Sequence, residues 1–452
     1  MADERAALLA ERFARDLADA WGERVEVTDL SRLTGGASRE TWLLEVTRAT
    51  GRARVIARIE PAGERGTLPL ETDAIRAAAE VGVPVPQVYA AGADDAVGGA
   101  YLLSEHIAGE TIPRKILRDE EYAAARAGLA RSLGETLARI HTARIAGPDR
   151  LTRVTDPVGD LVAQYGRGVP PAPGLALGLR RLRESAPAST RTTLVHGDFR
   201  LGNLMVDARG LAAVLDWELV HLGDPAEDLG WLCAKVWRFG SQLPAGGVGT
   251  REELLEGYAA VAGWHPSADD VAWWELHATV KWGLMCQLMT TTHTSGERPS
   301  VERAAIGRRT CEQEFDVLLL LGLDEPHPAP PLPETPTEPD LYGWPTAAQL
   351  ADGVEHYLRT GPQPLGGALG FEARVAGNVV AMMRREALLG EAARRAHATR
   401  LAHLGVAGDD ELSLAIEQGT LDDRWDEVTA CVRHAVRDRV AVANPRHLER
   451  PR

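Results

Sequence analysis

The fold of this chain is indicated first by residues 194–230, LVHGDFRLGNLMVDARGLAAVLDWELVHLGDPAEDLG. Three apolar runs in this stretch, at 194–195, 204–206 and 211–215, predict short β-strands. Asp198 follows the first run, Asn203 precedes the second, and Asp216 follows the third. The pattern therefore predicts two carboxylates and one amide at the ends of β-segments, where a rigid scaffold can present them to a cleft.

This placement suits phosphoryl transfer, in which the protein supplies position and charge rather than covalent chemistry. The reaction needs a carboxylate that orients the attacking hydroxyl and accepts its proton, together with oxygen ligands for Mg²⁺. Asp198 can be that base, and Asn203 and Asp216 can supply the oxygen ligands. A single Asp or Asn more often forms a cap or a turn, so only the combined pattern carries the prediction.

The His-x-Asp-x-x-x-x-Asn spacing in this stretch equals that of the kinase catalytic loop. HGDFRLGNLMVD and VLDWELVHLGDPAEDLGWL resemble the motifs of the aminoglycoside phosphotransferase and choline-kinase-like family, in the branch found fused to acyl-CoA dehydrogenases. The resemblance implies two catalytic-loop residues, Asp198 as the base and His196 as the side chain that braces the loop. It also implies Asn203 and Asp216 as metal ligands, and Asp228 as a buried structural acid.

Residues 25–60 contain β-like runs that predict strands around the turn TGGASRE. Gly35 and Gly36 can adopt backbone angles that other residues avoid, which lets the chain approach a ligand closely. A Gly-Gly pair between two strands also suits a plain hairpin turn. The family resemblance favours a loop that covers phosphates, with Ser38 as a donor to them.

Arg58 lies in the run VIARIEP, where kinases carry a lysine that holds the nucleotide phosphates and pairs with a helical glutamate. Lysine occurs in this chain only at positions 115, 235 and 281. The resemblance assigns the phosphate-holding role to Arg58 and the role of its partner to Glu71. An arginine suits the task because its planar fork binds phosphate through two donors. Without the resemblance, Arg58 would be a surface charge and Glu71 an acid favoured by a helix dipole.

The run AYLLSEHI, residues 100–107, predicts a strand that leads into the link between two lobes. The resemblance implies that backbone groups near Glu105 and Ile107 contact the base of a bound nucleotide, ATP or GTP. His141 closes an Ala/Leu/Arg-rich helical segment at 119–146, and we interpret it as a packed structural histidine.

The composition, 44% hydrophobic and 25% charged, is that of a globular protein. The net charge of −15 argues against a general nucleic-acid binder. No apolar run is long enough to span a membrane, and MADERAALLAERF predicts a charged amphipathic helix rather than a signal peptide. The four cysteines are scattered without a CxxC, which argues against a disulfide framework or a zinc site. We therefore expect a cytoplasmic protein.

The predicted fold class is α+β, a two-lobed protein-kinase-like fold followed by a small all-α domain. The kinase-like part is expected over residues 1–323. Its β-rich N-lobe is expected at about 25–107 and its helical C-lobe at about 108–323. The many tryptophans after residue 229 are interpreted mainly as core side chains.

Three further segments complete the predicted organisation. Residues 147–192 are rich in proline and glycine and are predicted to hold one short helix. Seven prolines within residues 324–340 predict an extended linker. Residues 341–452 are amphipathic at helical period, and they resemble an uncharacterised helical domain found beside such phosphotransferases. No chemistry can be assigned to that domain from its sequence.

The leading hypothesis is a small-molecule kinase that transfers the γ-phosphate of ATP or GTP to an acceptor hydroxyl with Mg²⁺. A protein kinase is disfavoured because no Ala-Pro-Glu motif follows Asp216. A hydroxyacyl-CoA or an aminoglycoside-like acceptor, and an enzyme of acyl-CoA metabolism as a partner, are implied by family resemblance alone. The alternative is a non-catalytic module that binds nucleotide or acyl-CoA and docks a partner enzyme. Arginine in place of lysine at position 58 keeps this alternative open.

Overall fold

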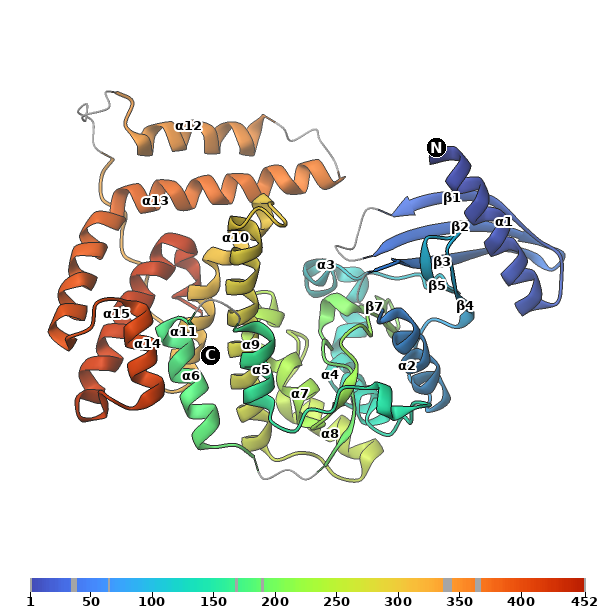
Figure 1. Cartoon of the computed structure of the whole chain (residues 1–452), viewed down its shortest axis with the longest axis horizontal. Helices are drawn as coiled ribbons and strands as arrows, with labels where there is room; N and C mark the ends of the chain where they lie inside the picture. Colours follow the sequence, from blue (N-terminus) through green and yellow to red (C-terminus); the bar gives the residue numbers. More distant parts are fainter. Residues whose placement is uncertain are drawn as a thin grey trace. The chain divides into compact units, whose positions relative to one another are not determined.

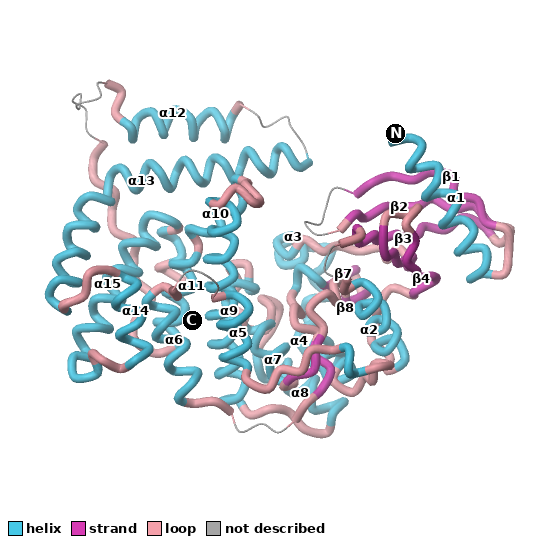
Figure 2. The backbone as a smooth tube through the Cα atoms, viewed as in Figure 1, coloured by secondary structure: helices cyan, strands magenta, loops and turns pink. Residues whose placement is uncertain are grey.

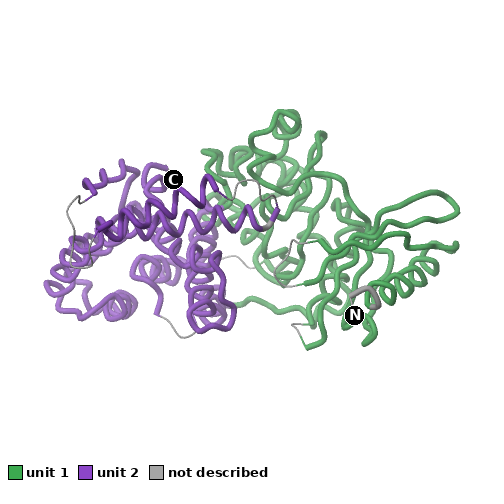
Figure 3. Tube along the Cα trace, turned by 90° about the horizontal axis from the view of Figure 1, so that it is seen from above, with its two compact units in different colours: residues 1–155, 189–233, 237–271 green, residues 156–188, 234–236, 272–452 purple. Residues whose placement is uncertain are grey.

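The computed structural model describes residues 2–33, 39–63, 66–166, 170–187, 191–335, 344–361 and 367–450. The predicted phosphate-loop residues Gly35, Gly36 and Ser38 lie outside these ranges. The chain forms two compact units, coloured separately in Figure 3. The first unit comprises residues 1–155, 189–233 and 237–271, and the second comprises residues 156–188, 234–236 and 272–452. The domain limits at 323 and 341 remain predictions.

A five-stranded antiparallel sheet with the strand order β1-β2-β3-β5-β4 forms the N-terminal lobe of the first unit (Figure 1). One of its faces packs against helix α1, whose Leu9, Phe13 and Leu17 are fully buried in the same core as the strand side chains. The elements are α1 (Ala2–Trp21), β1 (Val25–Leu33), β2 (Glu40–Arg48), β3 (Gly51–Pro61), β4 (Val88–Asp94) and β5 (Gly99–Glu105).

The alternation of side chains along β3 decides which face of the sheet carries Arg58. Val55, Ala57 and Ile59 are fully buried in the core shared with α1. Because successive side chains of a strand point to opposite faces, Arg58 points away from this core. It points toward helix α2 (Leu68–Glu80), where Glu71 is completely buried.

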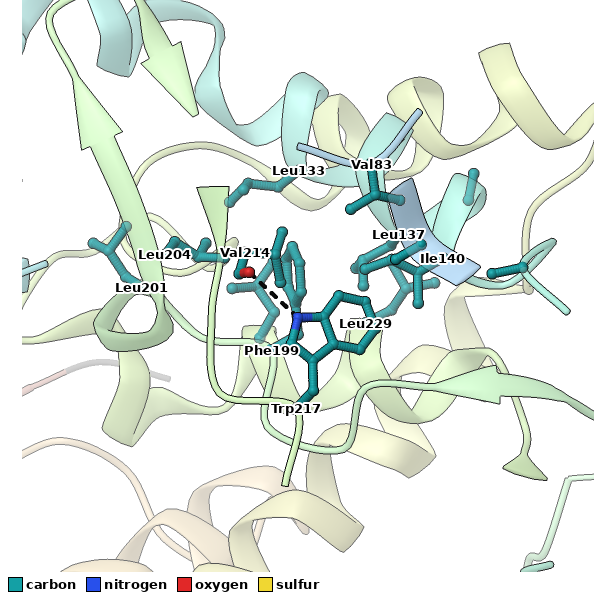
Figure 4. Packing of buried hydrophobic residues seen from close by; sticks show 14 of the residues in the cluster. Val83, Leu133, Leu137, Ile140, Phe199, Leu201, Leu204, Val214, Trp217 and Leu229 are labelled. Carbon is teal, nitrogen blue, oxygen red and sulfur yellow. Dashed lines mark hydrogen bonds between the residues drawn. The ribbon is translucent and has the colours of Figure 1, made fainter. Parts of the chain in front are cut away.

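The remainder of the first unit is a mainly helical lobe with two short antiparallel strand pairs, β6–β9 and β7–β8. Its core surrounds the fully buried Trp217, whose indole nitrogen donates to the carbonyl of Val214 at 3.3 Å (Figure 4). The elements are α3 (Pro113–Arg118), α4 (Ala123–Ile140), β6 (Thr193–Val195), β7 (Leu204–Asp207), β8 (Gly210–Val214), β9 (His221–Gly223), α7 (Ala226–Cys233) and α8 (Arg251–Ala262).

The described part of the second unit consists of helices and loops, as Figure 2 shows. Its core combines side chains of α6 and α11 with those of α13, α14 and α15. The helices are α5 (Pro157–Tyr165), α6 (Pro173–Glu184), α9 (Ala268–Thr294), α10 (Val301–Arg308), α11 (Thr310–Leu320), α12 (Ala347–Thr360), α13 (Gly367–Leu404), α14 (Asp409–Gln418) and α15 (Trp425–Ala443). The first four residues of α9 belong to the first unit.

Two prolines within residues 147–192 begin α-helices. Pro157 and Pro173 each stand in the first turn of a helix, α5 and α6. A proline is tolerated there because the missing N–H would have no partner within the helix. The prediction of one short helix in this segment was therefore wrong, since the segment contains two. The described linker residues 324–335 form neither helix nor strand, and the amide of His327 donates to the carbonyl of Leu448 at 2.9 Å.

Helix α11 buries three acids, and each has a basic partner. Glu312 lies 3.0 Å from Arg309. Glu314 lies 3.1 Å from Arg439 on α15. Asp316 lies 2.9 Å from Lys235 and 2.8 Å from His447. Burial alone would raise the pKa of Asp316, but the charges of His447 and Lys235 outweigh burial and lower it to about 2. Through Arg439 and His447, these buried acids connect α11 to the C-terminal part of the chain.

The α+β fold class, with a β-rich lobe, a helical lobe and a helical C-terminal region, is confirmed. None of the described helices combines the length and apolar character that crossing a membrane requires. The four cysteines are buried and free of disulfides.

Candidate active site

The Asp198 carboxylate, in the loop between β6 and β7, accepts from three donors, two in the same loop and one on helix α7. Trp231 Nε1 and Arg200 Nε donate to Oδ1 at 2.8 and 2.9 Å. Asn203 Nδ2 donates to Oδ2 at 2.6 Å and to the Asp198 carbonyl at 3.0 Å. The Asp198 side chain is 15% exposed. The carboxylate is therefore fixed in orientation and still reachable from solvent.

Asp198 and Asp216 are each followed in sequence by a fully buried aromatic residue. Phe199 follows Asp198, and Trp217 follows Asp216. Figure 4 shows both aromatic side chains in one apolar cluster. Large buried aromatic side chains contribute heavily to core stability. They anchor the backbone on which the two acids stand.

Asp228 ties the start of the loop to helix α7. Its carboxylate accepts hydrogen bonds from the backbone amides of His196 at 2.8 Å and Gly197 at 2.9 Å. His141 Nε2 lies 3.2 Å from the same carboxylate. Burial alone would raise the pKa of Asp228, but the His141 hydrogen bond and the nearby histidine charges lower the pKa. Asp228 therefore remains an anion that fixes the loop.

The two residues after β6 have little freedom. Gly197 has a φ of +82°, and a Cβ there would lie 2.5 Å from the carbonyl of Leu219, so only glycine fits. The His196 ring is fully buried, with Nε2 3.1 Å from the carbonyl of Leu215. A ring without exposed surface can position the loop, but it cannot touch a substrate. His141, 2.9 Å from the Tyr258 hydroxyl, is likewise a packed side chain.

Asp216 stands in an unusual backbone conformation beside Asn203. Its φ is +63°, a left-handed value that few residues other than glycine adopt. The amide of the preceding Leu215 donates to the Asn203 carbonyl at 2.9 Å, so the two predicted metal ligands stand on neighbouring segments. The Asp216 carboxylate is 35% exposed. Backbone strain of this kind gathers at functional sites, where surrounding structure holds it in place.

Arg58 joins the two lobes of the first unit. Its Nη1 donates to Oε1 of Glu71, and its Nη2 lies 3.5 Å from Oδ1 of Asp216. Burial alone would lower the pKa of the guanidinium, but Glu71 and Asp216 outweigh burial and raise that pKa. The structure thus brings Arg58 together with Glu71, the partner that the resemblance implies, and with Asp216; their roles remain predictions.

Glu71 has a second partner that sequence reasoning missed. Arg39 Nη1 donates to Oε2 of Glu71, and Arg39 Nη2 donates to the hydroxyl of Thr67 at 2.6 Å. Glu60 Oε1 lies 3.6 Å from Arg39 Nη2. The side chains of Arg39, Glu60 and Glu71 are 4%, 5% and 0% exposed.

The residues present suit a hard divalent cation. Asn203 donates through its amide nitrogen, so its amide oxygen is the atom that can ligate a metal. Asp216 adds a carboxylate. Magnesium needs only one or two protein carboxylates, because phosphates and water complete its shell. Over the described ranges, no group of three or more His, Cys, Asp or Glu side chains forms a ready-made metal cluster.

The predicted nucleotide-base contacts fall at the end of β5. The Glu105 amide donates to the Gln87 carbonyl at 2.9 Å, so this N–H is already used within the lobe. Ile107 lies in the extended segment that follows. A nucleotide base at this position would therefore be recognised by other backbone groups of the segment.

Three contributors to the site escaped the sequence analysis: Arg39, Arg200 and Trp231. Arg200 stands two residues after Asp198 in the quoted motif, so its position was a usable signal. Its guanidinium also lies 4.7 Å from the ring centre of Trp237. Trp231 was grouped with core tryptophans, and no local pattern marked its indole nitrogen as a donor to Asp198.

A β-rich lobe and a helical lobe joined by an Arg–Glu–Asp cluster, with an Asp and an Asn on the adjacent loop, are the features expected of a phosphotransferase. The family comparison agrees, because the model of the phosphotransferase enzyme family matches residues 29–268. The chain belongs to that family. Residues 363–447 match a domain of unknown function, DUF6285. The predicted family resemblance and the predicted phosphotransferase class are confirmed.

Two curated relatives share part of the chain. Acyl-CoA dehydrogenase family member 10 of Mus musculus is 31% identical over 169 residues, which cover 35% of this chain and 16% of that protein. Acyl-CoA dehydrogenase family member 11 of Rattus norvegicus is 28% identical over 228 residues, which cover 46% of this chain and 28% of that protein. The matches therefore span less than a third of either relative's length.

Solved structures of phosphotransferases are also similar to the chain. A macrolide 2′-phosphotransferase from Brachybacterium faecium is 18% identical, with a TM-score of 0.45, over 65% of this chain and 96% of its own. A spectinomycin phosphotransferase, solved with ADP and spectinomycin, is 11% identical, with a TM-score of 0.46, over 68% of this chain and 98% of its own.

Proposed function

We propose that this phosphotransferase is a small-molecule kinase that transfers the γ-phosphate of ATP or GTP to an acceptor hydroxyl. The observation that carries the proposal is the pairing of two charged groups. A carboxylate, Asp198, is oriented by three donors and still partly exposed. A guanidinium, Arg58, is fixed between Glu71 and Asp216. These are the base and the phosphate-holding cation that phosphoryl transfer requires.

In the proposed reaction, the Asp198 carboxylate accepts the proton of the acceptor hydroxyl. The hydroxyl oxygen then forms a bond to the γ-phosphorus, the bond from that phosphorus to the bridging oxygen breaks, and a nucleoside diphosphate leaves. Arg58 Nη2 is the arm that can meet the phosphates, because Nη1 is already bound to Glu71. Because the Asn203 and Trp231 hydrogen bonds fix both Asp198 oxygens beforehand, little reorganisation is needed.

Asn203 and Asp216 are the proposed Mg²⁺ ligands. Their amide and carboxylate oxygens are hard donors of the kind that Mg²⁺ prefers. When bound, the ion supplies positive charge that neutralises the phosphate oxygens in the transition state. Arg58 Nη2 lies 3.5 Å from the Asp216 carboxylate, so its charge adds to the positive field at the same place.

The acceptor is proposed to be a hydroxylated acyl-CoA or an aminoglycoside-like compound. The first choice is supported by similarity to proteins named as acyl-CoA dehydrogenase family members. The second is supported by membership of the phosphotransferase enzyme family.

An enzyme of acyl-CoA metabolism is the proposed partner. The free state of all four cysteines is in keeping with a reducing cytoplasm.

A thermal-shift experiment tests the metal–nucleotide site. The wild type and Asp216→Ala are heated with Mg-ATP and with Mg-GTP. Ligand at 100 times Kd should stabilise the wild type by about 2.7 kcal/mol. For a unit of this size, that corresponds to a rise in Tm of about 5–10 °C.

A matched control removes another carboxylate from the β7–β8 hairpin. Asp207 binds Arg209 and the hairpin amides, so Asp207→Ala should keep the full shift with nucleotide. Asp216→Ala should lose most of it. An absent shift in the wild type with both nucleotides would contradict the kinase proposal and favour the non-catalytic binding module.

A further inference from the structure

The two oxygens of the Glu71 carboxylate are bound by two different arginines. Arg58 Nη1 binds Oε1, and Arg39 Nη1 binds Oε2. Glu71 has no exposed surface, so both oxygens are committed to these side chains. Arg39 comes 32 residues before Glu71 in the chain and immediately precedes β2. The site therefore contains an extra cation beyond the Arg58–Glu71 pair that the motifs predicted.

The sharing of the Glu71 carboxylate between two arginines matters because position 58 is an arginine. A lysine ammonium is a single point of charge, whereas a guanidinium carries a planar fork that commonly binds both oxygens of a carboxylate at once. With both Glu71 oxygens available, the Arg58 fork could bind Glu71 through both Nη nitrogens and so turn its main pair of donors away from a phosphate. In the structure it does not do so, since Arg58 Nη2 lies 3.5 Å from Asp216 instead.

Arg39 is itself held firmly. It is 4% exposed, its Nη2 donates to the Thr67 hydroxyl at 2.6 Å, and Glu60 lies 3.6 Å away. Glu60 in turn accepts from the amide of Leu68 at 3.1 Å, at the start of α2. Buried ion pairs of this kind contribute little net stability compared with apolar side chains of the same size. A role in orienting Arg58 gives a reason for the pair that stability alone does not.

We propose that Arg39 is a positioning residue: it occupies the second oxygen of Glu71, so that Arg58 binds Glu71 with one arm and keeps the other for the nucleotide phosphates. This inference rests on the proposed role of Arg58 as the phosphate holder. It explains how an arginine can replace the kinase lysine at this position. Arg39 acts through Glu71 and Arg58 and touches neither substrate.

The test is a double-mutant cycle on the full-length chain, with the Kd for Mg-ATP measured by titration calorimetry. The variants are Arg39→Gln, Arg58→Lys and the two combined. With Arg58 present, Arg39→Gln should raise the Kd about tenfold or more, because the fork closes on Glu71. In the Arg58→Lys background, where the side chain has no fork, loss of Arg39 should change the Kd less than about threefold. Arg39→Lys keeps a charge on Oε2 and should stay near the wild-type Kd.

A purely structural role for Arg39 would weaken binding by the same factor in both backgrounds, and that result would overturn the proposal. Unchanged binding in Arg58→Ala, which removes the cation altogether, would refute the role of Arg58 itself, on which the proposal depends. Thermal unfolding of each variant shows whether it is folded. If Arg39→Gln does not fold, Thr67→Val loosens Arg39 more gently, and the same contrast between the wild-type and Arg58→Lys backgrounds is expected. Arg54→Gln is the control: it changes an exposed side chain on β3, the strand that carries Arg58, and should leave the Kd unchanged.

Discussion

Asp228→Asn should destabilise the first unit strongly at neutral pH. The carboxylate is fully buried and accepts from two backbone amides at 2.8 and 2.9 Å. Asparagine can accept from one of these amides, but it turns an NH₂ group toward the other. The loss of a charge-assisted hydrogen bond costs about 1.5–3 kcal/mol, and a buried N–H without a partner costs about 1–3 kcal/mol more.

The free energy of unfolding of Asp228→Asn should therefore be lower by about 3–5 kcal/mol, the range found when one partner of a buried ion pair is removed. At about 2–4 °C per kcal/mol for a unit of this size, Tm should fall by about 6–20 °C. The assay is thermal and urea unfolding of both proteins at pH 7. Asp119→Asn is the control, because that carboxylate is paired only at the surface, and it should change stability by less than about 1 kcal/mol.

The stability difference between wild type and Asp228→Asn should depend on pH. The pKa of Asp228 is lowered in the folded state. The ionised carboxylate therefore stabilises the fold fully above the ordinary pKa of about 3.9, and this stabilisation is lost as pH falls through the folded-state pKa. The stability difference between wild type and Asp228→Asn should therefore shrink in acid below about pH 4. A loss below 1 kcal/mol at pH 7, or a difference that stays constant into acid, would show that the Asp228 carboxylate does not stabilise the fold in this way.

Three further outcomes follow from other contacts. Gly197→Ala should cost about 1–3 kcal/mol in unfolding experiments and also lower activity, because its Cβ would meet the Leu219 carbonyl 2.5 Å away; an unchanged Tm would contradict this. Trp231→Phe keeps an aromatic side chain but loses the donor to Asp198, so kcat should fall about tenfold, while the smaller buried ring should also lower Tm; an unaltered kcat would argue against that hydrogen bond. Asp316→Asn should lose about 3–5 kcal/mol at pH 7, and it should lack the acid-dependent loss of stability that the wild type shows from about pH 4 toward pH 2.

The parts of the fold that local sequence determines were predictable. The residues around Asp198 and Asp216 lie within one stretch of 37 residues, and the strands, turn and buried aromatic side chains there depend on near neighbours. The family resemblance, rather than any local pattern, named Arg58 as the phosphate holder and Glu71 as its partner. The structure brings the two together, with Asp216 beside them.

Other parts depend on contacts that no local pattern encodes. Arg39 was overlooked because its partner Glu71 is 32 residues away. The partners of the buried acids of α11 could not be named from the sequence, since His447 lies 131 residues beyond Asp316. The proline-rich stretch before β6 was misjudged for a local reason: a proline in the first turn of a helix has the same composition signal as a proline in a loop.

Wild type and Asp198→Asn, assayed side by side, show whether Asp198 is the catalytic base. The readouts are ADP release from Mg-ATP, with water, a 3-hydroxyacyl-CoA or an aminoglycoside as acceptor, and the Kd of Mg-ATP. Turnover should fall by about 100-fold or more in the variant while the Kd changes little. Turnover at the wild-type rate in Asp198→Asn would show that Asp198 is not the base.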